Sequence, residues 1–560
     1  MHLLLVRHTG YPGLDINRRS LHLELLAPAA REGNLMQRNW FLYFTTFICG
    51  MAVMAVELSA SRLLAPYYGS SMITWTILIG VIMAALSLGN FLGGRLADRQ
   101  DTEASMFRLI WVASIWVAVI PFVGKYLITA SFVPLALVFP DSVLLAGTVC
   151  TCLIVFATPC LLLGAVTPCL VKLGVTDMER TGSVAGELYA LSTIGSIIGT
   201  FIPTFVTIPT IGTSKTFLLF AVLLNFTADG YYLRRGFQKK RTMAVAIVLM
   251  GLLLIPYHES YAFWKETLFE GESIYNYLQV RSEGGGTTLS THVEVGRQSI
   301  YLPDYQISGS YWEYALAGPF LRPNVTWQSP WSGLILGFGA GTFAKQARHF
   351  FPGASLTGVE IDPGMLEVAK KYFDFSPNDA RVVIDDGRAF LHRADTGTYD
   401  LIFLDAFQDV TIPFHMSTRE FFQEVRNHLA TDGVLVININ MRFEGQAGLL
   451  EHVSQTVRSV MPRIFRFDIP EAGNSMLYAP LASGAWEYYA RNLESVSGAH
   501  QMHPLLADVR GCAVEIPEGR LLLTDEVAPV EHLSQSVLDA VVRDSLREIF
   551  IRIFHSLRDI

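Results

Sequence analysis

The length and spacing of the apolar segments between Trp40 and Tyr257 constrain the fold of this chain more than any other feature. A helix that crosses a bilayer needs roughly 20 consecutive, mostly apolar residues. Short polar joints separate several runs of that length here. We predict membrane-spanning helices near residues 40–64, 73–95, 107–129, 142–173, 184–209, 215–233 and 242–257, the last being the shortest.

Composition supports a chain that is partly solvated by lipid. Of its 560 residues, 51% are hydrophobic and only 16% are charged, which is too apolar for an ordinary cytosolic protein. The net charge of -8 provides no basic surface for nucleic acid, so we expect none as a partner. The six cysteines have neither the spacing of a zinc site nor that of a disulfide framework, and we predict no metal.

Positive charges near the spans predict the orientation of the helices. Basic residues prefer the cytoplasmic side, and they gather in the turn GGRLADRQDTE and in the group Arg234, Arg235, Lys239, Lys240 and Arg241. With seven spans and a cytoplasmic N-terminus, the C-terminal part would lie outside the cell. An extra hairpin in 125–141, or a segment 242–257 that does not cross, would place it in the cytoplasm. The sequence permits either side.

Two carboxylates, Glu57 and Glu187, fall inside predicted spans. An ionisable group at membrane depth is costly and usually has a partner or lines a pathway, so a transport role and a structural hydrogen bond are both open. Gly195 and Gly199 have the GxxxG spacing that lets two helices approach closely, and we expect them to serve helix packing.

After Tyr257 the pattern changes to that of a soluble α/β protein. Residues 272–310 alternate in the manner of a small β-meander, and a helix is expected near 311–322. From Trp331 onwards strands and helices alternate. The predicted strands include 381–385, 399–407 and 433–439. Such a sheet is largely parallel and binds its ligand at the C-terminal ends of its strands.

Three sites in this core have the order expected for nucleoside binding. Gly337, Gly339 and Gly341 follow an apolar strand and precede a helix, where glycine lets a ligand approach the backbone. Glu360 ends the next strand, where a carboxylate can accept both ribose hydroxyls. Asp386, followed by Gly387, ends the third strand, near the expected adenine. No phosphate-binding lysine or arginine follows the turn, so we predict S-adenosylmethionine or its decarboxylated form.

Two further carboxylates follow the fourth strand in YDLIFLDAFQD. Asp405 would face the sulfonium carbon of such a ligand and could take a proton from an attacking amine. Asp409, one helical turn later, could hold the cationic tail of that substrate.

From Ser273 to Met476 the chain resembles the spermidine/spermine synthase family of polyamine aminopropyltransferases. The resemblance rests on SIYNYLQV, Gln306, YWEYAL, GFGAGT, VEID, DDGRAF and YDLIFLDAF. It implies that Glu360 holds the ribose, that Asp386 holds the adenine and that Asp405 deprotonates the acceptor amine. It also implies that Gln306 and Tyr311 line the polyamine groove. It also implies a homodimer and a donor that is a co-substrate rather than a tightly bound cofactor. The helical part resembles that of multi-span bacterial spermidine synthases.

The chain departs from the family pattern in the substrate region. Ala340 stands where the family's GGGDGG has an aspartate that holds the amino group of the donor, Asn276 replaces the glutamine of S-x-Y-Q, and DAFQD replaces D-S-S-D-P. A methyltransferase that uses S-adenosylmethionine is therefore one alternative. A transporter or sensor with a non-catalytic nucleoside-binding domain is another.

The fold class that we predict is a multi-span α-helical membrane domain followed by a small β domain and a Rossmann-like domain of the class I methyltransferase type. The expected boundaries are an N-terminal extension at 1–38, which is not translated if Met36 is the start; the membrane domain at 39–258; the β domain at 270–325; the catalytic domain at 330–480; and a C-terminal extension at 481–560. We expect a multi-pass protein of the cell membrane that acts on a small-molecule amine.

Overall fold

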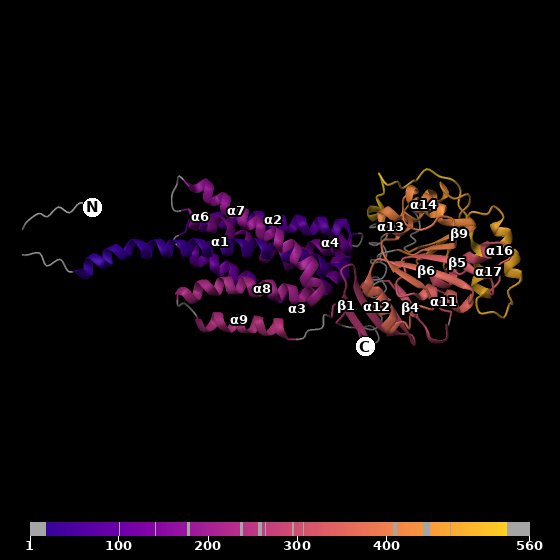
Figure 1. Cartoon of the computed structure of the whole chain (residues 1–560), viewed down its shortest axis with the longest axis horizontal. Coiled ribbons are helices and arrows are strands. Elements are labelled where there is room, and N and C mark those ends of the chain that lie inside the picture. Colours follow the sequence, from indigo (N-terminus) through magenta and orange to yellow (C-terminus); the bar gives the residue numbers. More distant parts are fainter. Residues whose placement is uncertain are drawn as a thin grey trace, which may run out of the picture.

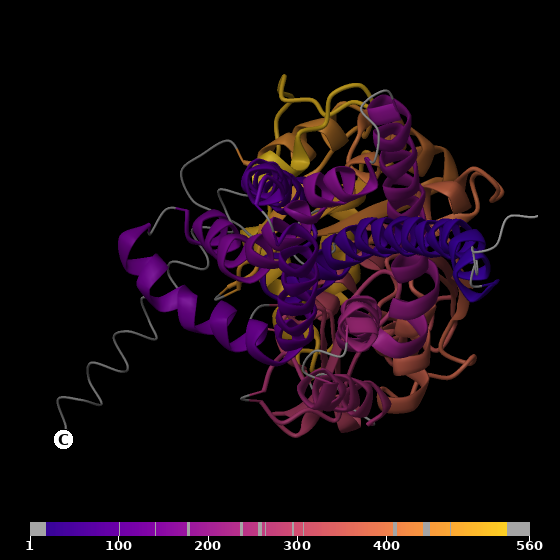
Figure 2. The same ribbon diagram turned by 90° about the vertical axis from the view of Figure 1, so that its left-hand side faces the viewer.

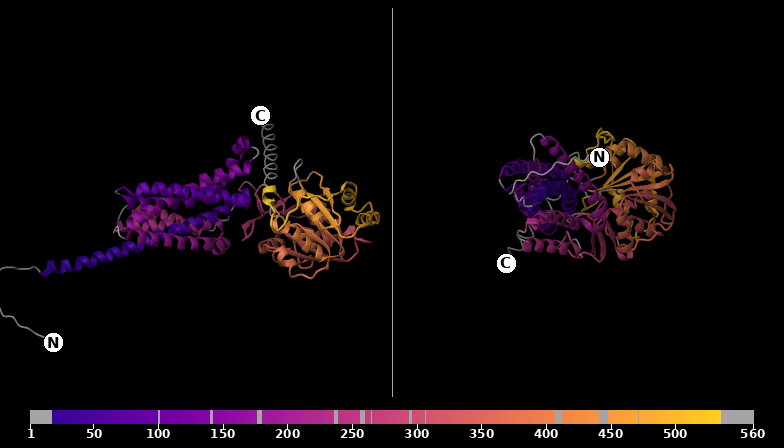
Figure 3. Two further views of the ribbon diagram at one scale, coloured as in Figure 1. Left: turned by 90° about the horizontal axis from the view of Figure 1, so that it is seen from above. Right: turned by 60° about the vertical axis from the view of Figure 1, so that its left-hand side comes forward.

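The structure, a computed structural model, describes residues 18–99, 101–139, 142–175, 180–235, 239–255, 260–263, 265–293, 296–305, 307–406, 412–440, 448–470 and 472–534. It has an elongated shape in which a bundle of helices and an α/β domain lie end to end (Figure 1). Seen along the bundle, the helices stand in front of the α/β domain (Figure 2). The view from above shows the same two parts (Figure 3).

The bundle follows the predicted apolar segments. Five helical segments are long and apolar enough to cross a membrane, and a sixth, shorter apolar helix follows within the part of the chain described. The helices are α1 (Arg18–Tyr68), α2 (Met72–Ala97), α3 (Thr102–Val138), α4 (Val143–Thr151), α5 (Ala157–Gly164), α6 (Val166–Gly174), α7 (Thr181–Ile202), α8 (Ile208–Arg235) and α9 (Lys239–Leu254), with π-helical turns at Cys152–Phe156 and Pro203–Thr207.

The fifth of these segments, 181–235, is not one straight rod. Gly212 has φ 82° and ψ 169°, which breaks the helix between the two spans predicted at 184–209 and 215–233. Both α7 and α8 pack against α1. A Cβ at Gly195 would lie 2.2 Å from the carbonyl oxygen of Phe47, and one at Gly199 would lie 2.1 Å from that of Met51. The glycine pair therefore serves close helix packing, as predicted.

The two carboxylates of the spans differ in their surroundings. Glu187 is exposed and accepts hydrogen bonds from the Tyr43 hydroxyl at 2.6 Å and the Ser183 hydroxyl at 3.2 Å. Glu57 is half-buried in α1. For Glu187 the structural hydrogen bond is therefore the better description.

The β domain is a four-stranded antiparallel sheet in the order β1 (Phe269–Glu272), β2 (Tyr277–Glu283), β3 (Gly286–Ser290) and β4 (Ser299–Tyr301). Gly284 and Gly285 both have positive φ, as a two-residue type I′ hairpin requires. The single helix expected near 311–322 is wrong. It is divided into α10 (Tyr311–Ala315) and a 3₁₀ turn at Gly318–Leu321, because Pro319 cannot donate the hydrogen bond that would continue α10.

The C-terminal domain is built on an eight-stranded sheet in the order β12-β10-β11-β9-β8-β5-β6-β7. The parallel strands are β5 (Trp331–Leu336), β6 (Ala354–Glu360), β7 (Arg381–Ile384), β8 (Tyr399–Leu404) and β9 (Leu429–Ile439). The antiparallel strands are β10 (Phe465–Asp468), β11 (Ser475–Pro480) and β12 (Val514–Glu515). The sheet is thus largely parallel, as predicted, with an antiparallel edge.

Helices cover both faces of this sheet, as burial of the hydrophobic strands requires. One core includes residues of α11 (Thr342–Phe350), α12 (Pro363–Tyr372), α16 (Ala485–Glu494) and α17 (His503–Cys512). The opposite core includes residues of α13 (Gly387–Leu391), α14 (Arg419–His428) and α15 (Leu449–Arg458). In Figure 1, β1 of the four-stranded sheet lies between the bundle and this domain, and α16 and α17 lie at the far end of the domain.

Candidate active site

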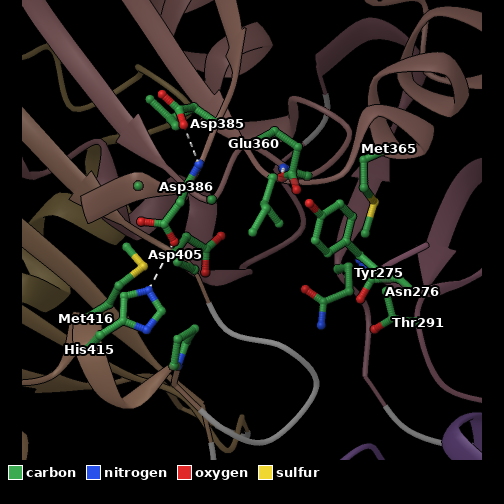
Figure 4. Close-up of a pocket in the computed structure, with 18 residues that line it drawn as sticks. Tyr275, Asn276, Thr291, Glu360, Met365, Asp385, Asp386, Asp405, His415 and Met416 are labelled. Atoms are coloured by element: carbon green, nitrogen blue, oxygen red, sulfur yellow. Dashed lines mark hydrogen bonds and ion pairs between the residues drawn. The ribbon is translucent and has the colours of Figure 1, made fainter. Parts of the chain in front are cut away.

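A cavity of about 340 Å³ lies at the C-terminal ends of β5, β6, β7 and β8. Of the residues predicted from the sequence, the structure brings six together in its wall: Gly337, Gly339, Glu360, Asp386, Gly387 and Asp405. Figure 4 shows Glu360, Asp386 and Asp405 around the space, with Tyr275 and Asn276 on the other side. Strands far apart in sequence thus converge at one edge of the sheet, where a parallel α/β fold binds its ligand.

The glycine turn allows the backbone to come close to Asp405. Gly337 has φ 88°, and a Cβ there would lie 2.4 Å from the carbonyl oxygen of Asp405. Gly339, at φ 56°, also lines the cavity. Gly341 does not line it. It precedes α11 with φ 85°, so its role is to start the helix.

Glu360 links the glycine turn to the end of β6. Its Oε2 accepts the N–H of Gly339 at 2.8 Å, and its Oε1 accepts the N–H of Asp362 at 3.0 Å. Burial raises the pKa of this carboxyl to about 7, although the backbone hydrogen bonds act in the opposite direction. The side chain is therefore fixed in place before any ligand arrives.

Asp386 begins α13 and is held from two sides. Its Oδ1 accepts the N–H of Ala389 at 2.8 Å, and its Oδ2 lies 3.0 Å from Nε2 of His415. Burial acts to raise the pKa of Asp386, but the hydrogen bonds from Ala389 and His415 outweigh it and hold the pKa below the ordinary value. The cavity therefore holds an ionised acceptor here.

Asp405 ends β8 inside the same cavity. Its Oδ1 accepts a hydrogen bond from Nδ2 of Asn438 at 2.9 Å, and its carboxylate is also hydrogen-bonded to the Tyr311 hydroxyl. Burial raises its pKa to about 7, and the nearby charge of Glu360 adds to this. Tyr311 is buried and does not line the cavity, so it supports Asp405 rather than forming the wall.

Two predicted substrate residues, Gln306 and Asp409, lie outside the described residues. The position of Ala340 is described: its side chain is buried and its N–H donates to the Ser299 hydroxyl at 2.8 Å. An amino group of a ligand in the cavity therefore has no side-chain acceptor at position 340.

Several lining residues were not singled out as ligand contacts by sequence reasoning, because each is a common side chain without a motif of its own. They are Tyr275, Thr291, Gln298, Met365, Asp385, His415 and Met416. The acid pair DD in DDGRAF was a usable signal for Asp385. Nothing near His415 in the sequence indicates that it meets Asp386.

Comparison with known proteins identifies the relatives of this chain. Residues 323–489 match the protein family described as "Spermine/spermidine synthase domain". A probable polyamine aminopropyl transferase of Bifidobacterium longum is 37% identical over 331 residues, covering 56% of this chain and 73% of that protein. The polyamine aminopropyltransferase of Vibrio vulnificus is 30% identical over 303 residues, covering 51% of this chain and 98% of that protein.

A solved structure of a probable spermidine synthase from Corynebacterium glutamicum covers 45% of this chain and 92% of its own, with 18% identity and a TM-score of 0.36. That likeness is distant. The sequence relatives are closer and match over most or nearly all of their own length. The chain belongs to the polyamine aminopropyltransferase family, whose members include the spermidine and spermine synthases.

Proposed function

We propose that the cavity binds decarboxylated S-adenosylmethionine and transfers its aminopropyl group to a small amine such as putrescine. The amine nitrogen forms a bond to the aminopropyl carbon next to sulfur. The carbon–sulfur bond breaks with its electron pair on sulfur, so that neutral methylthioadenosine leaves. The single observation that carries this proposal is the placement of the Asp405 carboxyl in the cavity that contains the glycine turn and Glu360.

The donor would lie along the strand ends. We assign the ribose hydroxyls to Glu360 and the adenine amino group to Asp386, with Gly337, Gly339 and Gly387 allowing close approach of the backbone. The fixed position of Glu360 and the low pKa of Asp386 support these roles, since both side chains are acceptors held in place. His415 would orient Asp386 through their 3.0 Å contact.

Asp405 would take the proton that the acceptor amine loses as the new bond forms. A base works best when its pKa lies near the operating pH, and burial places that of Asp405 at about 7. Asn438 and Tyr311 would hold the Asp405 carboxylate in position through their hydrogen bonds to it. We assign Gln306 and Asp409 to the acceptor's cationic tail.

We also propose that the helical half spans a cell membrane several times and that two copies pair. The length and apolar character of five helices support the first statement, and family resemblance supports the second. The boundaries 39–258, 270–325 and 330–480 are proposed as the membrane, β and catalytic domains, with extensions at 1–38 and 481–560.

Identification of the nucleoside product tests the proposal. Detergent-purified protein is given putrescine with decarboxylated S-adenosylmethionine in one reaction and with S-adenosylmethionine in another, and the products are measured by mass spectrometry. We expect methylthioadenosine from the first reaction only. S-adenosylhomocysteine from the second would instead show a methyltransferase, the alternative that Ala340 favours. Absence of both products would contradict both transferase functions and favour a binding role.

A further inference from the structure

The wall of the cavity opposite Asp386 is attached to the helical bundle. Figure 4 shows Tyr275, Asn276 and Thr291 together on that side. The carbonyl oxygen of Ile274, next to Tyr275, accepts a hydrogen bond from the guanidinium of Arg62 in α1. Two residues after Thr291, the N–H of Val293 donates to the carbonyl oxygen of Pro66 at 3.0 Å, also in α1. Both segments of the wall therefore rest on the last two turns of one helix.

A continuous series of contacts leads from this helix to the proposed ribose site. Ser273 and Asn276, on either side of Ile274 and Tyr275, both donate to Oδ2 of Asp362, at 2.6 and 2.8 Å. The N–H of Asp362 in turn donates to Oε1 of Glu360 at 3.0 Å. A shift of the 273–276 segment would therefore move Asp362 and, with it, one of the backbone hydrogen bonds that fix Glu360.

Other contacts hold the two halves of the molecule together, so Arg62 is not needed for that purpose. Thr213, next to the break at Gly212, donates from its N–H and hydroxyl to Glu272 at 3.2 and 2.7 Å. The Tyr67 hydroxyl donates to the carbonyl oxygen of Tyr261 at 2.7 Å. Residues from both sides also share one hydrophobic core: Leu64, Tyr67 and Tyr68 from α1, Tyr261 from the segment before β1, and Tyr277 and Val293 from the β domain.

We infer that Arg62, although it belongs to a predicted membrane helix, is a positioning residue of the nucleoside site. Its guanidinium fixes the Ile274 carbonyl, which sets the position of Tyr275 and Asn276 in the wall and, through Asp362, that of Glu360. The end of the bundle is thus a structural part of the active site and not only an anchor. This inference rests on the proposed function of the cavity.

Substitution of Arg62 tests the inference in the full-length protein in detergent. The affinity for methylthioadenosine is measured by calorimetry, and KM for the donor and kcat are measured separately. We expect Arg62→Ala to raise Kd and KM by about five- to ten-fold, which lies within the range usual for coupling through a network, with little change in kcat. Arg62→Lys, which keeps a charged donor, should restore most of the affinity. The apparent melting temperature should match that of the native protein.

Arg235→Ala is the matched control. Arg235 is the last residue of α8, at the opposite end of that helix from Thr213, where it pairs with Glu103 of α3 at 2.7 Å and does not line the cavity. It should leave Kd and KM unchanged. If Arg62→Ala does not fold, Arg62→Met keeps the apolar stem without a donor and gives the same test.

Unchanged Kd and KM in Arg62→Ala would overturn the inference. So would a loss of affinity that accompanies a lower melting temperature and is not restored by lysine, since that would show a merely structural role. Failure of the native protein to form methylthioadenosine would contradict the proposed reaction, while the calorimetric comparison would still decide the role of Arg62.

Discussion

Replacement of Asp405 by asparagine separates binding from chemistry in the proposed reaction. The amide has nearly the shape of the carboxyl, its oxygen can still accept from Asn438, and its nitrogen can donate to the Tyr311 hydroxyl. The surroundings of the side chain should therefore persist. The variant cannot accept the proton of the acceptor amine, and general-base catalysis contributes about 10²–10⁴-fold to a rate. We expect kcat to fall by that factor.

The assay is steady-state formation of methylthioadenosine at pH 8, where a carboxyl with a pKa of about 7 is mostly ionised in the native protein. Calorimetry with methylthioadenosine should give a similar Kd for both proteins. Asp400→Asn is the control at the opposite end of β8. Asp400 pairs with Arg322 at 2.7 Å and accepts the N–H of Ser332 at 2.8 Å, so its loss should lower stability and leave kcat unchanged. A kcat in Asp405→Asn within about ten-fold of native would refute the role of Asp405 as the base.

The geometry of the site supports four further predictions. Because burial raises the pKa values of Asp405 and Glu360 to about 7, kcat/KM should rise with pH through about 7, and a flat profile from pH 5 to 9 would contradict this. Glu360→Gln should weaken methylthioadenosine binding by about ten- to a hundred-fold. The raised pKa of Glu360 stabilises the folded state fully at pH values below the pKa of this group in the unfolded chain, near 4.5. This contribution to stability is lost as the pH rises to about 7. The melting temperature of Glu360→Gln should therefore depend less steeply on pH in that window, and equal slopes would contradict the pKa. Gly337→Ala should lower the free energy of unfolding by more than the roughly 1–3 kcal/mol expected from backbone strain alone, because the added Cβ would meet the Asp405 carbonyl. Gly397→Ala, with φ 69° and open space around it, should cost only the strain, and equal unfolding free energies for the two variants would refute the contact argument.

Sequence reasoning succeeded where a local pattern has one structural meaning. Spans of about twenty apolar residues became helices, and GFGAGT became a turn between strand and helix with three positive-φ glycines. Glu360, Asp386 and Asp405 were placed at strand ends, and parallel strands bring such ends to one edge. The same reasoning grouped Gly341 with the two glycines that line the cavity, because spacing alone does not separate a glycine that lines a cavity from one that starts a helix.

The sequence by itself determined that this chain joins apolar helices to a nucleoside-binding α/β domain, and it identified the carboxylates that line the cavity. These features depend on residues within one segment and on the period of hydrophobic residues along it. Only the tertiary structure decided that His415 meets Asp386, that Tyr311 stands behind Asp405, and that Arg62 reaches Ile274 across 212 positions of sequence. Each of these contacts joins segments that carry no shared local signal, so it exists only once the sheet, the β domain and the bundle have packed together.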